Sequence, residues 1–493
     1  MTTRAGAGSG TVSTDVPARM DRLPWARWHW MVLVGLGTVW ILDGLEVTIV
    51  GALGSQLTSP SGGLRLSDTG VGAAASVYII GAVLGALILG YVTDRVGRKK
   101  LFLVTLGIYL VATVLTAFSF APWWFFVMRF LAGFGVGGEY AAINSAVDEL
   151  IPARVRGTVD LVVNGSYWFG AAVGAALTIV LLNPALLAEW LGWRLCFGIG
   201  AVLGVGILLV RRKVPESPRW LFTHGRAEEA DELVSGIERT VTEQSGQRLD
   251  PVHDTIDVHE RGATGFGVVG RTLLRRYPRR SLLGLGLFVG QAFLYNAVYF
   301  TEALVLSTFF KVSGIIAGAY LIPLALGSLA GPLVLGRLFD TVGRRTMITI
   351  SYLGSAVLLA VTGVLFGGGM LTATTLTIAW AVVFFLASAG SSAAYLTVSE
   401  VFPLEIRAMA IALFYAVGTG LGGIVGPLLF GHLVGTGHLT AVAIGYYVGA
   451  AVMAIGGVAE LLLGVEASQR SLEDIAAPLS SEPGEEATAP ATS

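Results

Sequence analysis

The sequence is poor in charged residues and almost without cysteine. Only 13% of its 493 residues are Asp, Glu, Lys or Arg, whereas a soluble domain of this length carries about 25%. Cys196 is the single cysteine, which excludes an intramolecular disulfide. The formal net charge of −1 says little about partners, and we expect no nucleic-acid partner.

Patterns typical of catalytic and metal sites are also missing. The six histidines are dispersed without ligand spacing, and no Ser–His–Asp arrangement or phosphate loop is present. We therefore expect no enzyme, no catalytic residue, no metal, no cofactor and no ATP-driven pump. The glycines of "GFGVGG" from Gly133 lie inside an apolar run without a preceding strand, so we interpret them as a small-residue helix-packing face.

Long apolar runs dominate what is present. Hydrophobic residues make up 54% of the chain, and a helix of about 20 apolar residues spans the ~30 Å core of a bilayer. These runs predict an all-α polytopic membrane protein with twelve transmembrane helices. The predicted spans are 28–53, 69–91, 101–119, 122–148, 158–182, 190–212, 281–309, 313–337, 347–367, 371–399, 407–431 and 439–464.

Basic residues indicate how the chain is oriented. Lys and Arg gather before the first run, in short loops on one side and in the loop over 211–280, while the intervening loops carry almost none. Basic short loops remain cytoplasmic. We therefore expect a multi-pass protein of the plasma (inner) membrane with both termini inside. The first span is expected to be an uncleaved insertion signal, because no compact signal-peptide core precedes it.

The segments between and beside the spans divide the chain. Polar, Ser- and Ala-rich ends predict disordered tails, and one long amphipathic stretch from about 217 to 241 predicts cytoplasmic helices. The predicted parts are a cytoplasmic N-terminal tail (1–27), a six-helix bundle (28–212), a cytoplasmic loop with amphipathic helices (213–280), a second six-helix bundle (281–464) and a cytoplasmic C-terminal tail (465–493).

Two phrases occur twice. "GYVTDRVGRKK" from Gly90 returns as "GRLFDTVGRRT" from Gly336, and "ELIPARVRG" from Glu149 returns as "EVFPLEIRA" from Glu400. The offsets, 246 and 251 residues, are nearly equal. Two unrelated phrases that recur in order at one offset indicate a duplication. The two bundles are therefore predicted to be pseudo-symmetric, as in transporters built from internal repeats around a central site.

With "RFLAGFGVGGEY", "PESPRWL" and "SEVFP", these phrases resemble the major facilitator superfamily, and within it the branch of sugar porters and metabolite–proton symporters. The phrases extend from residue 90 to 403, so the likeness covers the whole membrane domain. It is specific for the superfamily and much less so for a substrate. The resemblance implies transport of a small solute by alternating access.

Three ionisable residues inside the spans are candidates for proton coupling. Asp43 and Glu46 are three apart on one helix face, and a charge at the bilayer centre costs ~2.5–3.5 kcal/mol. By resemblance, Arg129 lies beside them, Glu46 occupies the position of the sugar porters' proton-carrying acid, and Arg129 is its partner. An ionised carboxylate would bind Arg129, and a protonated one would release it. Which acid carries the proton is left open, and a static ion pair is the alternative.

The resemblance also implies the substrate-binding residues Asn164, Gln291, Asn296 and Tyr395. Gln291 and Asn296 keep the spacing of the family's sugar ligands, whereas Asn164 and Tyr395 replace its usual Gln and Trp. Each lost hydrogen bond to a neutral partner is worth ~0.5–1.5 kcal/mol. Fewer amides and more aromatics favour a carboxylated or aromatic metabolite over a sugar, with Arg129 as a second ligand.

The charges of the repeated phrases predict cytoplasmic gating. We expect the acids to bind arginines or helix N-termini when the cytoplasmic side is closed; the alternative is that these charges only set orientation and anchor the turns. The predicted gating residues are Asp94, Arg95, Arg98, Glu149 and Arg156 in the first half and Asp340, Arg344, Glu400 and Arg407 in the second.

Together these observations predict a secondary transporter that moves an organic or aromatic acid or a sugar-like solute by proton symport, with the proton gradient as its energy source. A proton-independent facilitator and an efflux antiporter remain as alternatives. A non-transporting solute sensor is a further one, although the loop and tails look too small for a signalling domain. We expect a monomer. The sequence predicts neither the identity of the solute nor the direction of transport.

Overall fold

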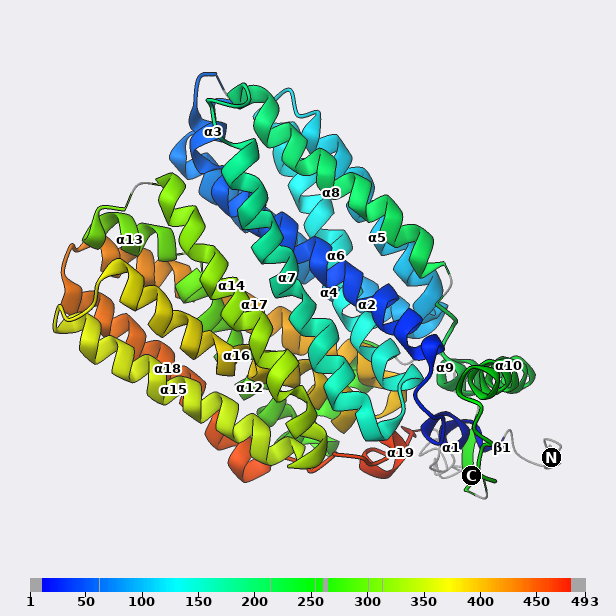
Figure 1. The fold of residues 1–493 in the computed structure, drawn as a ribbon. Helices are drawn as coiled ribbons and strands as arrows, with labels where there is room; N and C mark the ends of the chain where they lie inside the picture. Colours follow the sequence, from blue (N-terminus) through cyan, green and yellow to red (C-terminus); the bar gives the residue numbers. More distant parts are fainter. Residues whose placement is uncertain are drawn as a thin grey trace, which may run out of the picture.

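The computed structural model describes residues 11–61, 63–212, 214–252, 254–259, 265–299, 301–312 and 314–479. Long helices form two bundles that lie side by side (Figure 1). The first bundle contains α2 (Arg27–Ala52), α4 (Asp68–Val96), α5 (Arg98–Ala117), α6 (Pro122–Leu150), α7 (Arg156–Leu181) and α8 (Glu189–Arg211). The second contains α12 (Pro278–Tyr299), α14 (Gly314–Thr341), α15 (Arg344–Gly367), α16 (Ala373–Val401), α17 (Arg407–Gly435) and α18 (Leu439–Leu463).

These helices correspond one to one to the predicted spans. Within the described ranges, eleven helices are long and apolar enough to cross a membrane. The other long bundle helix is α6, which is rich in glycine and carries Arg129, Glu139, Asp148 and Glu149. All four of these charged side chains are buried, so α6 contributes polar groups to the interior while its neighbours supply the apolar surface. Leucine and valine side chains cover the outside of the bundles, for example Val202 and Leu428, as a lipid-facing surface requires.

Glycines allow α6 to pack closely on α4, as the interpretation of "GFGVGG" predicts. A Cβ atom on Gly137 would meet the backbone of Ala82, and one on Gly133 would meet the backbone of Tyr78. Small residues at such positions let helix backbones approach within direct contact. This close approach brings the polar side chains of α6 next to those of α2 and α4.

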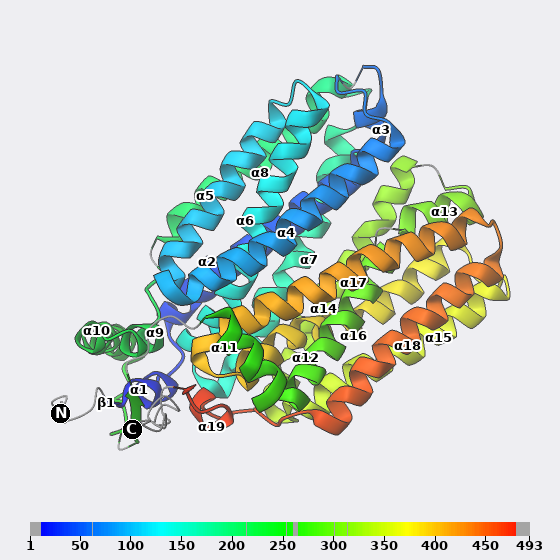
Figure 2. The same cartoon turned by 180° about the vertical axis from the view of Figure 1, so that it is seen from behind.

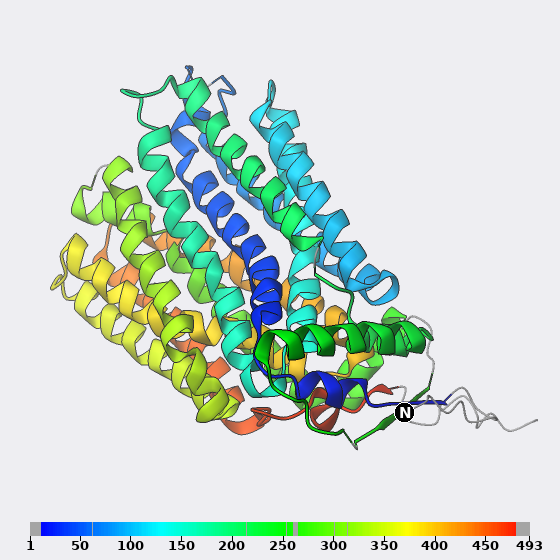
Figure 3. The same cartoon turned by 45° about the vertical axis from the view of Figure 1, so that its right-hand side comes forward.

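The two ends of the molecule differ. The α19 end holds α1 (Val16–Asp21), α9 (Pro218–Thr223), α10 (Ala227–Ser245) and α19 (Leu472–Ile475); α10 lies across the bundle helices in Figure 3. The α3 end holds α3 (Gly54–Thr58) and α13 (Glu302–Phe310). The bundles meet where α7 contacts α14 and α17 contacts α4, and they diverge towards the α3 end (Figure 2).

Short elements complete the described chain. The strand β1 (Thr11–Thr14) pairs antiparallel with β2 (Ile256–His259) in the loop between the bundles. The short helix α11 (Phe266–Arg271) and the π-helical turn η2 (Thr272–Arg276) precede α12. Two 3₁₀ turns, η1 (Ala153–Val155) and η3 (Leu404–Ile406), introduce α7 and α17.

The structure corrects the prediction of disordered tails for residues 11–27 and 465–479; residues 1–10 and 480–493 lie outside the described residues. Apolar side chains of both segments are buried, including Met20, Leu23 and Leu472. Glu466 accepts a hydrogen bond from the backbone N–H of Arg344 at 2.9 Å. The composition of each tail is polar on average, but a few apolar residues at the right positions suffice to dock it on the bundles.

Charge pairs hold the N-terminal segment on α10. Arg19 binds Glu238 at 2.7 Å and also Asp231, and Arg22 binds the same Glu238. Partial burial acts to raise the pKa of Glu238, but the hydrogen bonds from Arg19 and Arg22 outweigh it and hold this pKa below its ordinary value of 4.5. A lowered folded-state pKa stabilises docking above pH 4.5, and this contribution is lost as the pH falls through the folded-state value.

We therefore expect Arg19→Ala to release residues 11–27 at neutral pH, and acidification below the ordinary pKa of Glu238 to do the same in the unaltered protein. Chymotrypsin cleavage near Leu23 measures the first effect, and amide hydrogen exchange, corrected for its intrinsic pH dependence, measures the second. Arg27→Ala is the control, because Arg27 is exposed. Equal cleavage of both variants would show that the apolar contacts alone hold the segment.

Candidate functional site

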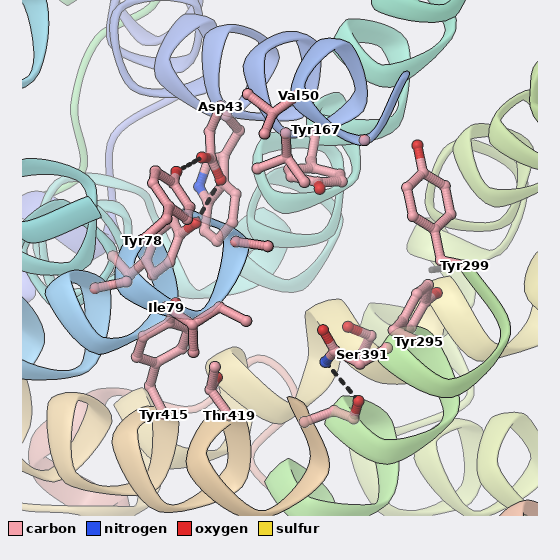
Figure 4. A pocket seen from close by; sticks show the side chains of 18 of the residues that line it. Asp43, Val50, Tyr78, Ile79, Tyr167, Tyr295, Tyr299, Ser391, Tyr415 and Thr419 are labelled. Atoms are coloured by element: carbon pink, nitrogen blue, oxygen red, sulfur yellow. Dashed lines mark hydrogen bonds between the residues drawn. The ribbon is translucent and has the colours of Figure 1, made fainter. Parts of the chain in front are cut away.

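A cavity of about 370 Å³ lies between the bundles. Its walls come from α2, α4, α6 and α7 of the first bundle and from α12, α16 and α17 of the second (Figure 4). The lining continues to Leu57 of α3 and Val71 at the start of α4, so the cavity extends towards the α3 end. Helix residues near the middle of each span therefore form its floor.

Aromatic side chains dominate the cavity wall. Trp40 stacks on Tyr140 with ring centroids 4.5 Å apart, and Trp40 meets Tyr395 of the other bundle edge-on at 5.7 Å. Trp168 stacks on Tyr295, again across the two bundles, at 5.0 Å. The aromatic lining residues are Trp40, Tyr78, Phe125, Tyr140, Tyr167, Trp168, Tyr295, Tyr299, Tyr395 and Tyr415.

The predicted proton-coupling residues lie together at one side of this cavity. Glu46 accepts hydrogen bonds from Arg129 and, at 3.1 Å, from the hydroxyl of Thr113. Arg129 lines the cavity, and its guanidinium carbon lies 4.3 Å from the centre of the Tyr78 ring. These side chains are buried in the first bundle, and the exposed fractions of Glu46 and Arg129 are 3% and 1%.

Asp43 has different partners from those expected. Its carboxylate lines the cavity and accepts hydrogen bonds from the hydroxyls of Tyr78, at 2.8 Å, and Tyr140. Figure 4 shows Asp43 and Tyr78 joined in this way above the cavity. The prediction that both acids lie on one arginine is therefore wrong for Asp43: among the described residues, Glu46 is the acid that forms an ion pair with Arg129.

Sequence reasoning missed Tyr78 and Tyr140. A signal for Tyr140 was present: it follows Arg129 by eleven residues, which is close to three helical turns, and therefore shares its face of α6. No comparable signal marks Tyr78, whose backbone lies directly against Gly133 of α6 in the structure.

The structure brings the four predicted substrate residues Asn164, Gln291, Asn296 and Tyr395 to the cavity wall. The side-chain oxygen of Gln291 accepts a hydrogen bond from Ser391 at 3.1 Å. Asn296 donates to the carbonyl of Ala292 in its own helix at 2.6 Å. The amide nitrogen of Asn164, at the cavity floor, donates a hydrogen bond to the side-chain oxygen of Asn144 at 2.9 Å.

A buried charge layer closes the α19 end of the cavity. Glu149 binds Arg98 of its own bundle at 3.0 Å and Arg407 of the other bundle at 3.5 Å. In the repeated counterpart, Glu400 binds Arg344 at 3.1 Å and Arg156 of the other bundle at 3.7 Å. We call this set, completed by Asp340, the charge layer: Arg98, Glu149, Arg156, Asp340, Arg344, Glu400 and Arg407.

Asp340 connects the bundles through a helix N-terminus. It accepts hydrogen bonds from the backbone N–H groups of Gly157, at 3.0 Å, and Thr158, at 2.7 Å, in the first turn of α7. It also accepts from Arg344 at 2.8 Å. A carboxylate is favoured there because the first N–H groups of a helix have no partner within the helix.

In the first repeat, one of the predicted gating residues does not take part in the charge layer. Arg95 lies outside the charge layer: its side chain is exposed and stacks on the Tyr91 ring of its own helix at 4.0 Å. An arginine at a helix end finds water more readily than a buried partner, which explains the difference. The side chain of Asp94 lies outside the described part of the structure.

The tails add partners that sequence reasoning did not assign. Arg219 of "PESPRWL" binds Glu473 at 2.9 Å and Asp21 at 3.4 Å, and Asp21 also reaches Arg156 at 3.4 Å. Burial acts to raise the pKa of Glu473, but Arg219 outweighs burial and lowers it. Both terminal segments touch the charge layer at Arg156, which binds Asp21 and also donates to the carbonyl of Arg470 at 3.3 Å.

The sequence family described as "Sugar (and other) transporter" matches residues 27–478. The chain belongs to this family. The twelve-helix fold of the major facilitator superfamily and the resemblance to metabolite transporters are thereby confirmed. Its relatives are transporters, so the protein is a multi-pass membrane transporter of small molecules and not an enzyme.

Three curated relatives differ in the solute that they are named for. The niacin transporter NiaP of Acinetobacter baylyi is 29% identical over 85% of this chain and 90% of its own length. The D-xylose transporter of Levilactobacillus brevis is 26% identical over 84% and 88%. The gentisate transporter of Corynebacterium glutamicum is 31% identical over 41% and 44%.

Solved structures with the same fold include the proton:xylose symporter XylE bound to 6-bromo-6-deoxy-D-glucose. It is 20% identical, with a TM-score of 0.73 over 90% of this chain and 98% of XylE. A partially occluded inward-open XylE from E. coli superimposes with a TM-score of 0.63 at 18% identity, over 87% of this chain and 97% of XylE. At this level of identity the likeness concerns the fold alone.

Proposed function

We propose that this transporter is a proton symporter of the plasma membrane that imports a small aromatic acid. The observation that supports it most is the cavity wall, which ten aromatic side chains line together with Arg129, itself paired with the buried Glu46. In this proposal both termini and the α19 end are cytoplasmic, in agreement with the basic short loops. The structure then represents the outward-facing state, open towards the α3 end.

Size and chemistry of the cavity favour a flat ring. A volume of about 370 Å³ lies at the small end of ligand pockets, which span roughly 300–1,000 Å³. Each favourable ring–ring contact adds ~0.5–1.5 kcal/mol beyond the burial of apolar area. Niacin and gentisate, for which two of the relatives are named, are both aromatic acids.

Proton binding and solute binding are linked through Arg129. While Glu46 is ionised, it occupies the guanidinium of Arg129. A proton on Glu46 removes the ion pair and leaves Arg129 free to donate to a solute carboxylate at the cavity wall. By linkage, the bound carboxylate favours protonation of Glu46 to the same extent. The proton gradient then supplies the energy, and no cofactor is needed.

A sugar-like solute is the second candidate. Gln291, Asn296 and Ser391 place amide and hydroxyl groups on the wall supplied by the second bundle, where they suit solute hydroxyls. The named D-xylose relative agrees with this candidate. It is the weaker one, because Asn296 donates within its own helix and Asn164 is held by the floor.

Proteoliposomes loaded with a pH dye test both candidates. Aromatic acids, sugars, polyols and small carboxylates are added singly, with protein-free liposomes as the control because protonated aromatic acids cross lipid unaided. Acidification by an aromatic acid above that control is expected. Acidification by sugars alone would replace the first candidate with the second. Counterflow without acidification would identify a facilitator, and no movement at all would favour a sensor.

A further inference from the structure

Two more carboxyl groups lie between the cavity floor and the charge layer. α6 and α7 run antiparallel and are joined by the hydrogen bond from Asn164 to Asn144 at 2.9 Å. Asp148 follows Asn144 by one helical turn, and Asp160 precedes Asn164 by one turn, so the two acids are neighbours on the side of the α19 end. Asn164 lines the cavity. These acids are therefore one helical turn beyond the floor.

Neither acid has a cation of its own. Both are 0% exposed. Among the described residues, no hydrogen bond reaches either oxygen of Asp148, and one oxygen of Asp160 also lacks a partner. The other oxygen of Asp160 accepts from Asn164 at 3.1 Å. The hydroxyl of Ser399 lies within reach of the Asp148 carboxyl group, but in this structure it donates to the carbonyl of Leu396 at 2.8 Å.

The surrounding charges are already paired. The groups whose charge acts on the two acids are Arg156, Arg344, Arg407 and Glu400, from α7, α15, α17 and α16. Each of these arginines is bound to Glu149, Glu400 or Asp340 in the charge layer. Two additional ionised carboxylates would therefore add two uncompensated buried charges, and a buried carboxylate without a partner becomes neutral rather than bear that cost.

We propose that Asp148 and Asp160 share one proton and form an inner proton site, separate from Glu46 and Arg129. The acid that carries the shared proton donates a hydrogen bond through its O–H group to the other acid, so that one buried negative charge remains within reach of Arg156. The unpartnered oxygens of Asp148, held fully inside the protein next to a second acid, are the observation that carries this site.

The charge layer supplies a release mechanism, which rests on the proposed proton symport. Arg156 and Arg407 act on Asp148 and also form the two ion pairs between the bundles. When the α19 end opens, these pairs separate. Arg156 stays on the same bundle as both acids and, once it has lost Glu400, has a guanidinium nitrogen available to bind them. The shared proton then passes to cytoplasmic water, and both acids are left as carboxylates with Arg156 as the cation between them.

Infrared difference spectroscopy of the purified transporter tests the site without any solute. The C=O stretching band of a protonated carboxylic acid, which shifts in D₂O, is followed from acid to alkaline buffer. We expect Asp148→Asn and Asp160→Asn each to remove the same band, because the amide replaces the protonated partner. Glu302→Gln is the matched control: Glu302 is another buried acid, with no hydrogen-bond partner in the described part of the chain, and its substitution should leave this band in place.

Three results would overturn the shared site: the band surviving in both variants, the two variants removing different bands, or a band that responds to Na⁺ rather than to pH. Gel filtration and thermal unfolding identify a variant that fails to fold, in which case Asp148→Glu, which should keep the band, replaces it. If no solute moves protons through the unaltered transporter while the shared band is present, the proposed symport fails and the inner site stands. If the Asp148→Asn variant still accumulates solute as well as the unaltered transporter does, the release step is refuted.

Discussion

Glu46→Gln is expected to abolish accumulation driven by a proton gradient while counterflow exchange of the same solute stays measurable. Glutamine can still accept the hydrogen bond from Thr113, but it neither ionises nor binds a proton. Arg129, which pairs with Glu46 in this structure, is then free at every pH. Solute binding therefore loses its dependence on the proton, and the gradient no longer drives the cycle.

The size of the effect follows from the burial of the pair. Removing one partner of a buried ion pair costs ~3–5 kcal/mol because the other charge remains uncompensated. A loss of folding must therefore be separated from a loss of coupling, by thermal unfolding and by the counterflow assay itself. Glu302→Gln again serves as control, since it removes a buried carboxyl far from Arg129 in the chain.

Asp43→Asn is the comparison that decides which acid carries the proton. Asp43 lines the cavity and is held by two tyrosine hydroxyls rather than by Arg129, so its substitution should weaken solute binding and leave the proton dependence in place. Intact accumulation by Glu46→Gln, together with loss of accumulation in Asp43→Asn, would transfer the coupling role to Asp43.

Asp340→Asn is expected to open the α19 end and to slow transport without abolishing solute binding. An asparagine loses the charge that binds the N–H groups of Gly157 and Thr158, and it presents an NH₂ group where the carboxylate accepted from Arg344. Hydrogen bonds to a charged group are worth ~1.5–3 kcal/mol. The ratio of closed to open molecules should therefore fall about tenfold or more, since 1.4 kcal/mol changes an equilibrium constant by a factor of ten.

A reporter cysteine measures this opening. Cys196 is buried and is the single cysteine of the sequence, so Cys196→Ser gives a background free of thiols. Ala408→Cys then places a thiol at the start of α17, where Ala408 is fully buried. Maleimide should label it faster in Asp340→Asn.

Thr341→Ala is the matched control, because Thr341 is exposed and donates to the carbonyl of Arg337 in its own helix. Equal labelling and equal turnover in Asp340→Asn and the unaltered protein would reduce the charge layer to an orientation signal.

The predictions from sequence were strongest where a pattern is local or repeated. Apolar runs located every long bundle helix, because a bilayer demands about 20 apolar residues wherever a helix crosses it. They were weakest at the two terminal segments. The composition of these segments is polar on average, but a few buried apolar residues, such as Met20 and Leu472, hold them on the bundles.

The candidate site shows the same division. The duplication of two phrases placed Glu149, Arg156, Glu400 and Arg407 in one layer, and a charge in an apolar run marked Glu46 and Arg129. The repeats did not show that the ion pairs cross between the bundles: each glutamate binds one arginine of its own half and one arginine of the other half.

The sequence by itself determined the membrane location, the twelve helices, the duplication and the residue types that carry charge into the interior. These follow from composition, period and spacing, which depend only on neighbours along the chain. Only the tertiary structure decided that Asp43 binds tyrosines, that Glu46 pairs with Arg129, and that Asp148 is buried with no hydrogen-bond partner among the described residues. The physical reason is that a buried polar group takes its partner from whichever helix packs against it, and glycine contacts between distant helices set that packing.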